Sequence, residues 1–199
     1  MQGSVSITAA VDDHIYSENF ADTGGGKEKH EISLPAGKAG NAAWNASSAV
    51  ITLGAGHGLT SADIVAVKWA TGRRIAMTIS AYDSTTITVT NSSGRGDALP
   101  TSSTAAVVVG PRVVCGDASF DGDNARFLLV TVDQYLSIDF YDSTPTNLYY
   151  VSVQAGSGYY WSYATGVSPP ITGNPVASAE VYNHTITAAT LKVSVILVS

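Results

Sequence analysis

The chain has 199 residues, of which 45% are hydrophobic and only 13% charged, and its formal net charge is −6. This composition excludes a disordered chain and leaves room for one large domain or two small ones. The ten Lys and Arg residues are scattered along the sequence, which disfavours binding to nucleic acid or to an anionic membrane surface.

The N-terminal part predicts two short strands. Ser4–Val11 alternates apolar and polar residues, and His30–Leu34 ends at a Pro-Ala-Gly turn. Lys27–Lys29 follows three glycines and is interpreted as a solvated turn. Residues 37–48 are small and polar, so we interpret them as a linker. The start of the chain lacks the basic and apolar regions of a signal peptide.

The middle of the chain predicts more closely spaced strands, separated by turns rich in Gly and Asp. They are Ala49–Leu53, Ile64–Trp69, Arg74–Ser80, Thr85–Thr90 and Thr104–Val109. Strands of this number and length suffice for a small barrel or a compact sandwich.

The last part of the chain predicts longer strands. They are Val113–Cys115, Arg126–Val132, Leu136–Tyr141, Tyr149–Gln154, Gly158–Tyr163, Ala177–Tyr182 and Thr190–Val198. The final one is apolar almost to the C-terminus, and an exposed end of that kind promotes aggregation. We therefore expect it to be held in a sheet, beside the N-terminal strand or against a neighbouring subunit.

These elements predict an all-β protein: an antiparallel β-sandwich with a small β-barrel-like module, either inserted or consecutive. Residues 1–48 would supply an N-terminal arm and the first strands of the sandwich. Residues 49–109 would form the five-stranded module, and residues 110–199 the main β-sandwich with its C-terminal strand. We favour the inserted arrangement.

Motif searches favour no catalytic chemistry. The glycine-rich run 54–58 lacks the Lys-Ser/Thr of a phosphate-binding loop and leads into a strand, so a tight turn explains it. The four histidines are widely separated and show no zinc spacing. Cys115, the only cysteine, lies at an apolar strand end and suits a buried structural thiol. The tripeptide Arg95-Gly96-Asp97 matches an integrin-type motif, but three residues match easily by chance. We predict no catalytic residue, no metal and no cofactor.

Two sets of aspartates leave two alternative functions open, a calcium site and a glycan hydrolase site. Asp117, Asp121 and Asp123 lie near one turn and offer oxygen ligands for calcium, although their spacing is not that of an EF-hand. A solvated acidic turn is the simpler interpretation. Another three carboxylates flank two strands near aromatic residues, as a glycan hydrolase on a β fold would require, and strand ends explain them more simply. These are Asp133, Asp139 and Asp142.

Aromatic residues gather between positions 135 and 163. Tyr and Trp combine a large apolar body with a polar tip, which suits protein interfaces and stacking on sugar rings. Because consecutive strand residues point to opposite faces, some of them should lie outside the core. The residues predicted to contact a partner or a glycan are Tyr149, Tyr150, Tyr159, Tyr160, Trp161 and Tyr163.

With these features, the chain resembles tailed-bacteriophage virion structural proteins of the capsid decoration or cement class. The resemblance rests on the low charge, the short strands rich in Ala, Ser, Thr, Gly and Val, and the apolar terminal strand. The segment from His57-Gly58-Leu59-Thr60-Ser61 through Gly94-Arg95-Gly96-Asp97-Ala98-Leu99-Pro100 is similar to small β modules of virion proteins.

The resemblance implies a non-enzymatic protein of the virion, assembled in the host cytoplasm, that binds the capsid exterior and bridges capsid subunits. It would be a homo-oligomer, with a trimer favoured, and residues 1–40 could lie across a neighbour by strand addition. Two alternatives remain: a tail or receptor-binding component with a carbohydrate-binding aromatic face, and a β-fold glycan hydrolase.

Overall fold

The computed structural model describes residues 4–11, 14–21, 27–91, 94–101, 103–116, 125–141, 147–162 and 178–197, with side chains for fewer of them. No helix occurs among these residues, which confirms the predicted all-β class. The strands are β1 (Ser4–Val11), β2 (His14–Ala21), β3 (Lys27–Leu34), β4 (Lys38–Asn45), β5 (Ser48–Thr52), β6 (Ile64–Trp69), β7 (Gly72–Tyr82), β8 (Thr86–Thr90), β9 (Arg95–Gly96), β10 (Thr104–Gly116), β11 (Ala125–Val132), β12 (Leu136–Tyr141), β13 (Asn147–Val153), β14 (Gly158–Ser162), β15 (Ser178–Asn183) and β16 (Ala189–Leu197).

Six strands close into a barrel in the order β10-β4-β5-β8-β7-β6. The circle closes because β10 pairs with β4 through Thr104–Val109 and with β6 through Val108–Pro111. Trp44 and Trp69 meet edge to face inside the barrel, with ring centroids 5.2 Å apart. Such a pair contributes about 0.5–1.5 kcal/mol beyond its buried area.

The linker predicted over residues 37–48 is wrong, because β4 occupies most of it and is a barrel strand. Ala42 and Trp44 are buried while their neighbours in the strand point outward. Small residues on both faces conceal this alternation in the sequence. Lys27–Lys29 likewise begins β3 instead of forming a turn, and β2 was not predicted.

The barrel forms one lobe of the molecule. The other lobe is a sandwich of two sheets, β13-β12-β15-β10 and β14-β11-β16-β3. Its core takes inward-facing residues from both sheets: Leu34, Cys115, Val130, Val132, Leu136, Ile138, Phe140, Val153, Ala179, Val181, Ala189, Leu191 and Val193. The C-terminal strand β16 lies between β11 and β3. β16 is therefore held in a sheet, as expected, but the N-terminal strand β1 is not one of its neighbours.

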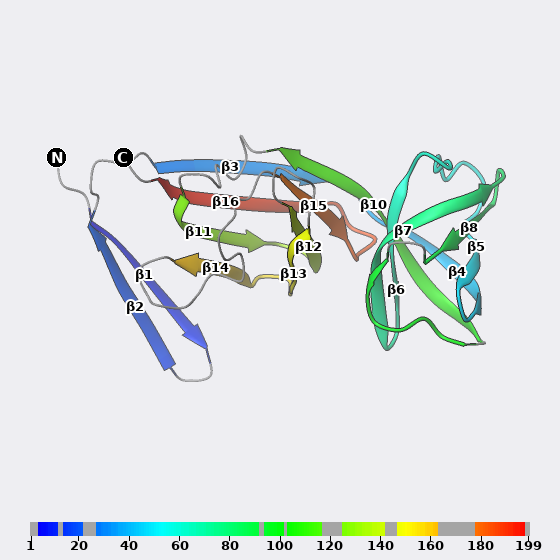
Figure 1. Cartoon of the computed structure of the whole chain (residues 1–199), viewed down its shortest axis with the longest axis horizontal. Coiled ribbons are helices and arrows are strands. Elements are labelled where there is room, and N and C mark those ends of the chain that lie inside the picture. Colours follow the sequence, from blue (N-terminus) through cyan, green and yellow to red (C-terminus); the bar gives the residue numbers. More distant parts are fainter. Residues whose placement is uncertain are drawn as a thin grey trace.

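The chain enters the sandwich as β3, leaves to build the barrel, and returns through β10 (Figure 1). The barrel is therefore inserted between two segments of the sandwich. The predicted separate strand Val113–Cys115 is the end of β10, which is shared by both lobes. β1 and β2 form a hairpin of their own that projects at the end of the sandwich far from the barrel (Figure 1).

Candidate functional site

The aromatic residues predicted to contact a partner are divided among different parts of the fold. Tyr149 and Tyr159 are half-buried against the sandwich core, where their rings stack with centroids 5.9 Å apart. Burial raises the pKa of the Tyr159 phenol. These two rings complete the edge of the core between β13 and β14.

The remaining members of the aromatic set lie elsewhere. Tyr150 faces the barrel and takes part in the contact between the lobes. Tyr160 and Trp161 belong to β14, where their backbones pair with Leu129 and Leu128 of β11, and their side chains lie outside the described part of the chain. Tyr163 also lies outside the described residues. The contact role of the set stays a prediction.

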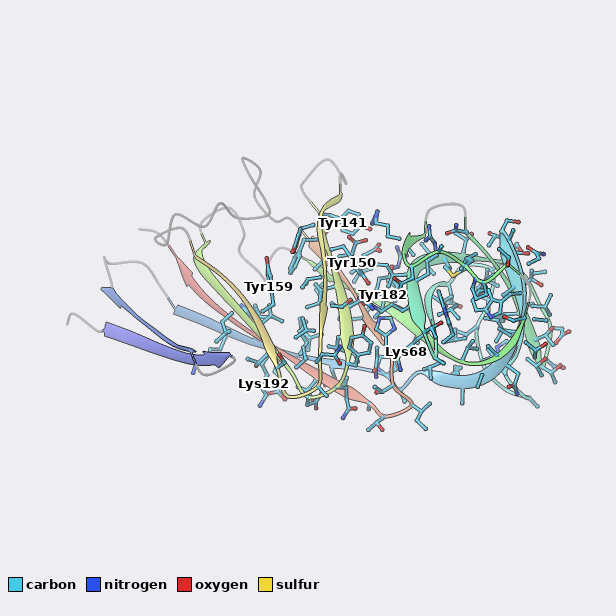
Figure 2. All side chains as sticks on the ribbon, turned by 90° about the horizontal axis from the view of Figure 1, so that it is seen from below. Lys68, Tyr141, Tyr150, Tyr159, Tyr182 and Lys192 are labelled. Atoms are coloured by element: carbon cyan, nitrogen blue, oxygen red, sulfur yellow. The ribbon has the colours of Figure 1, made fainter. Side chains whose placement is uncertain are left out.

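A layer of polar side chains, here called the seam, joins the barrel to the sandwich. It arises because successive side chains of a strand point to opposite faces of the sheet. Leu136, Ile138 and Phe140 of β12 point into the sandwich core. Their neighbours Ser137 and Asp139 therefore face the barrel. Figure 2 shows Lys68, Tyr141, Tyr150 and Tyr182 along the boundary between the two lobes, whereas Tyr159 and Lys192 lie away from it. The seam residues are Lys68, Arg73 and Arg95 of the barrel and Tyr135, Ser137, Asp139, Tyr141, Tyr150, Ser152, Glu180, Tyr182 and His184 of the sandwich.

Arg73 anchors one half of the seam. Its Nε donates to the Tyr150 hydroxyl at 3.0 Å and to Ser152 Oγ at 2.8 Å. The Arg73 guanidinium also lies 5.4 Å from the Tyr135 ring centroid, within the range of a cation–π contact. Behind these groups, the Ser137 hydroxyl is 2.6 Å from Nε2 of the buried His184. One barrel cation thus engages three sandwich side chains.

Arg95 anchors the other half of the seam. Its guanidinium pairs with the buried carboxylate of Asp139 and donates to the Tyr141 hydroxyl at 3.0 Å. The Tyr141 hydroxyl in turn donates to Asp139 at 2.8 Å. Burial raises the pKa of Asp139, and the hydrogen bond from Tyr141 and the charge of Arg95 oppose that shift.

Glu180 extends this network across β15. Arg112 of β10 pairs with Glu180 Oε1 at 2.6 Å, and the Tyr182 hydroxyl donates to Oε2 at 2.7 Å. Burial and the adjacent Glu180 carboxylate raise the pKa of Tyr182, which keeps its phenol protonated as a donor. An apolar contact of Tyr182 with Ala66, Ile75 and Ala76 of the barrel completes the seam.

The seam explains several side chains considered for chemistry. Asp139 is engaged by Arg95 and Tyr141, so it contributes to the joint between the lobes. Arg95 and Asp97 of the integrin-type tripeptide are also used within the chain, since Asp97 accepts the backbone N–H of Arg73 at 2.9 Å. Sequence reasoning missed Arg73 and Glu180. The sequence did contain one signal for the seam: apolar and polar residues alternate in β12, so a polar face with a carboxylate lies opposite its core-facing side.

A shallow groove of about 340 Å³ lies on the sandwich away from the seam. It is lined by residues of β3, β11 and β16 and of the turns after β11 and β13, and most of these residues have polar or charged side chains: Glu31, Thr131, Val132, Asp133, Gly156, Ser157, Thr190 and Lys192. Lys192 stands directly opposite both Glu31 and Thr131 in the strand register. Asp133 accepts the backbone N–H of Thr190 at 2.7 Å. Hydroxyls and charges of both signs suit a polar ligand.

The structure also places other motif residues. The glycine-rich run forms the turn between β5 and β6, and His57 Nε2 lies 2.8 Å from the backbone oxygen of Asp83. Cys115 is buried, as predicted. Asp117, Asp121, Asp123 and Asp142 lie outside the described residues. Within the described ranges, no three His, Cys, Asp or Glu residues are placed to hold a metal ion, and no helix is long and apolar enough to cross a membrane.

Comparisons with known proteins give little similarity. The sequence matches no protein-family model and no curated protein. Among solved structures, the chain has a distant similarity to the "Crystal Structure of the STIV MCP", a viral major capsid protein. The identity is 8% and the TM-score 0.23, over 98% of this chain and 95% of the other. At this TM-score the similarity does not establish a common fold.

Proposed function

We propose that this chain is a non-enzymatic structural protein of a virion, of the decoration or cement type, that binds the capsid exterior and bridges capsid subunits. The observation that carries the proposal is the joint between the lobes. A protein that bridges subunits has to resist being stretched between its contacts. Here β10 passes through both lobes, and the ion pair between Arg95 and Asp139 ties them side by side.

The use of polar residues also supports a structural role. In the seam, acids, tyrosines and arginines bond to one another instead of surrounding an open cavity. Few charges remain for the rest of the surface, since charged residues make up 13% of the chain. A weakly charged surface suits a protein that is largely covered by its neighbours in an assembly.

The test uses capsids of the virus that encodes this chain, assembled without it. We expect the purified protein to sediment with these capsids, to saturate at a fixed number of copies per capsid subunit, and to raise the temperature at which the capsids open. Arg95→Met is the informative variant. We expect it to bind capsids almost as well as the wild type but to raise their opening temperature by less, because its two lobes are no longer held together by the ion pair. Absence of saturable binding would overturn the proposal, and so would turnover of a polysaccharide by the purified chain.

A second candidate is a tail or receptor-binding component that recognises a carbohydrate. The groove beside Asp133 and Lys192 favours it, because carboxylates, hydroxyls and an ammonium group are the partners that sugar hydroxyls need. Binding on a glycan array that is lost in Lys192→Ala would support this function for the groove. Binding lost in Trp161→Ala but kept in Lys192→Ala would assign it to the predicted aromatic face.

A further inference from the structure

The N-terminal hairpin is incomplete by itself. β1 and β2 pair along their whole length, from Ser4 opposite Ala21 to Val11 opposite His14. No other strand in the described part of the chain joins this sheet. A two-stranded hairpin is at best marginally stable in water, so it needs a further strand or an apolar surface. Its position beyond the sandwich leaves it available to another molecule (Figure 1).

The hairpin register also gives it two unlike faces. One face carries the alternate residues of β1 that are apolar, and six of its eight positions are apolar or aromatic: Val5, Ile7, Ala9 and Val11 opposite Phe20, Glu18, Tyr16 and His14. The other face begins with Ser4, Ser6 and Thr8. Covering the first face with apolar surface would stabilise the hairpin.

The two edges of the nearest sandwich sheet differ in charge. At one edge, β3 begins Lys27-Glu28-Lys29 and continues through Glu31, a pattern that discourages strand addition. At the other edge, β14 has the sequence Gly-Tyr-Tyr-Trp-Ser, which carries no charge. No described strand pairs with the outer side of β14. This edge has the chemistry that accepts another strand.

The other uncharged edge strand, β13, is a poorer acceptor. Its Tyr150 and Ser152 are hydrogen-bonded to Arg73, which places the barrel beside it. The hairpin lies at the opposite end of the molecule (Figure 1). The edge of β14 is therefore the better acceptor for such a hairpin.

Chain length favours a second copy over the same chain as the acceptor. In the order β14-β11-β16-β3, a strand added outside β14 would lie four spacings, about 19 Å, from β3. The steps from Ala21 to Lys27 reach at most about 21 Å when fully extended. Docking within one chain would need that segment to be almost straight across the whole sheet. A neighbouring molecule imposes no such demand.

We propose that the β1–β2 hairpin of one copy of this chain adds to the β14 edge of a second copy, continuing the sheet β14-β11-β16-β3 across the interface. The contact joins unlike surfaces, so it forms a closed ring when the rotation between successive copies closes and an open filament when it does not. A ring of three copies would match the trimer favoured from the sequence. The inference deepens the proposed function by naming a second copy of the chain as a partner, and it rests on the homo-oligomer that the sequence resemblance implies for such a protein.

Photo-cross-linking of the full-length chain tests the pairing directly. Benzoyl-phenylalanine replaces Phe20, and chains labelled with ¹⁴N and ¹⁵N are mixed before irradiation. We expect mixed-isotope cross-links between the hairpin and the peptide containing residues 158–162. Cross-links confined to one isotope, or directed to another strand, would overturn the proposal.

A pair of charge variants tests the edge. Tyr160→Lys places a charge at the middle of β14, and Ser33→Lys places the same charge on the exposed position of β3, the opposite edge of the same sheet. In light scattering we expect Tyr160→Lys to weaken self-association at least tenfold and Ser33→Lys to leave it unchanged. If circular dichroism shows that Tyr160→Lys does not fold, Ile7→Lys in the hairpin replaces it with the same expectation. Wild-type association in the folded variant would contradict the inference.

The inference and the proposed function fail separately. A cross-linked oligomer that ignores capsids would overturn the virion role and leave the hairpin exchange standing. A monomer that saturates capsids would overturn the exchange alone.

Discussion

Arg95 of the barrel forms an ion pair with Asp139 in β12 of the sandwich, and the Asp139 side chain is fully buried while that of Arg95 is 32% exposed. The pair connects residues 44 positions apart in the chain. Burying a carboxylate without a counter-ion costs free energy. The folded state is therefore more stable when the barrel lies where Arg95 reaches the Asp139 carboxylate.

Breaking this pair from the Arg95 side should therefore destabilise the protein. Arg95→Met leaves the buried Asp139 carboxylate with Tyr141 as its donor, and we expect the free energy of unfolding to fall by about 3 kcal/mol. The double variant Arg95→Met with Asp139→Asn removes the buried negative charge, so it should recover part of that loss. Urea denaturation of the wild type, of Arg95→Met and Asp139→Asn singly, and of the double variant completes the cycle. Additive losses would mean that the two side chains are not energetically coupled.

His184 should make stability depend on pH. Burial, together with the nearby Arg73 and Lys68, lowers its pKa to about 3, whereas the unfolded value is about 6.5. Between these values the unfolded chain binds a proton that the folded chain does not. The free energy of unfolding therefore falls as the pH is lowered through this window, by up to about 1.4 kcal/mol per pH unit.

The comparison variant for this prediction is His184→Gln. It retains a polar group toward Ser137 but does not titrate. The raised pKa of Asp139 acts in the opposite direction and is present in both proteins, so their difference isolates His184. Urea denaturation at pH 7 and pH 4.5 should show the wild type losing about 2–3 kcal/mol more than the variant. Parallel losses would contradict the assignment.

The sequence predicted the strands better than it predicted the seam, for a physical reason. β12 alternates apolar and polar residues, β6 is almost entirely apolar, and both have the predicted bounds. In β4, Gly, Ala and Asn weaken the contrast between apolar and polar positions, so the sequence alone predicts a linker there. The polar face of β12 is visible in the sequence, but its partner Arg95 is set by the three-dimensional position of the barrel. Local periodicity carries no information about that position.

Cys115 should be inert in the folded protein. It is 4% exposed, and burial raises its pKa to about 11, so little reactive thiolate exists at pH 8. We expect a thiol reagent to label it only when the sandwich opens, at a rate that rises with urea. Fast labelling of the native protein at the rate of a free thiol would show that this part of the core is open.

Gly110 should be intolerant of any side chain because it lies where β10 passes from barrel to sandwich. A Cβ at this position would overlap the backbone oxygen of Asn183 and lie 3.0 Å from its carbonyl carbon. Asn183 is unable to retreat easily, since its side-chain amide donates to the backbone oxygens of Pro35 and Thr187 at 2.9 and 2.7 Å. We expect Gly110→Ala to lower the free energy of unfolding by about 3 kcal/mol.

Gly54→Ala is the matched control, because a Cβ there meets no atom within 4 Å and the penalty comes only from the backbone angle φ of +91°. That strain should lower the free energy of unfolding by about 1 kcal/mol. Tryptophan fluorescence during urea denaturation measures both variants, since the Trp44–Trp69 pair reports on the barrel core. The close approach of β10 to β15 at Gly110 requires the larger loss there. An equal or smaller loss in Gly110→Ala would mean that the two strands separate at little energetic cost.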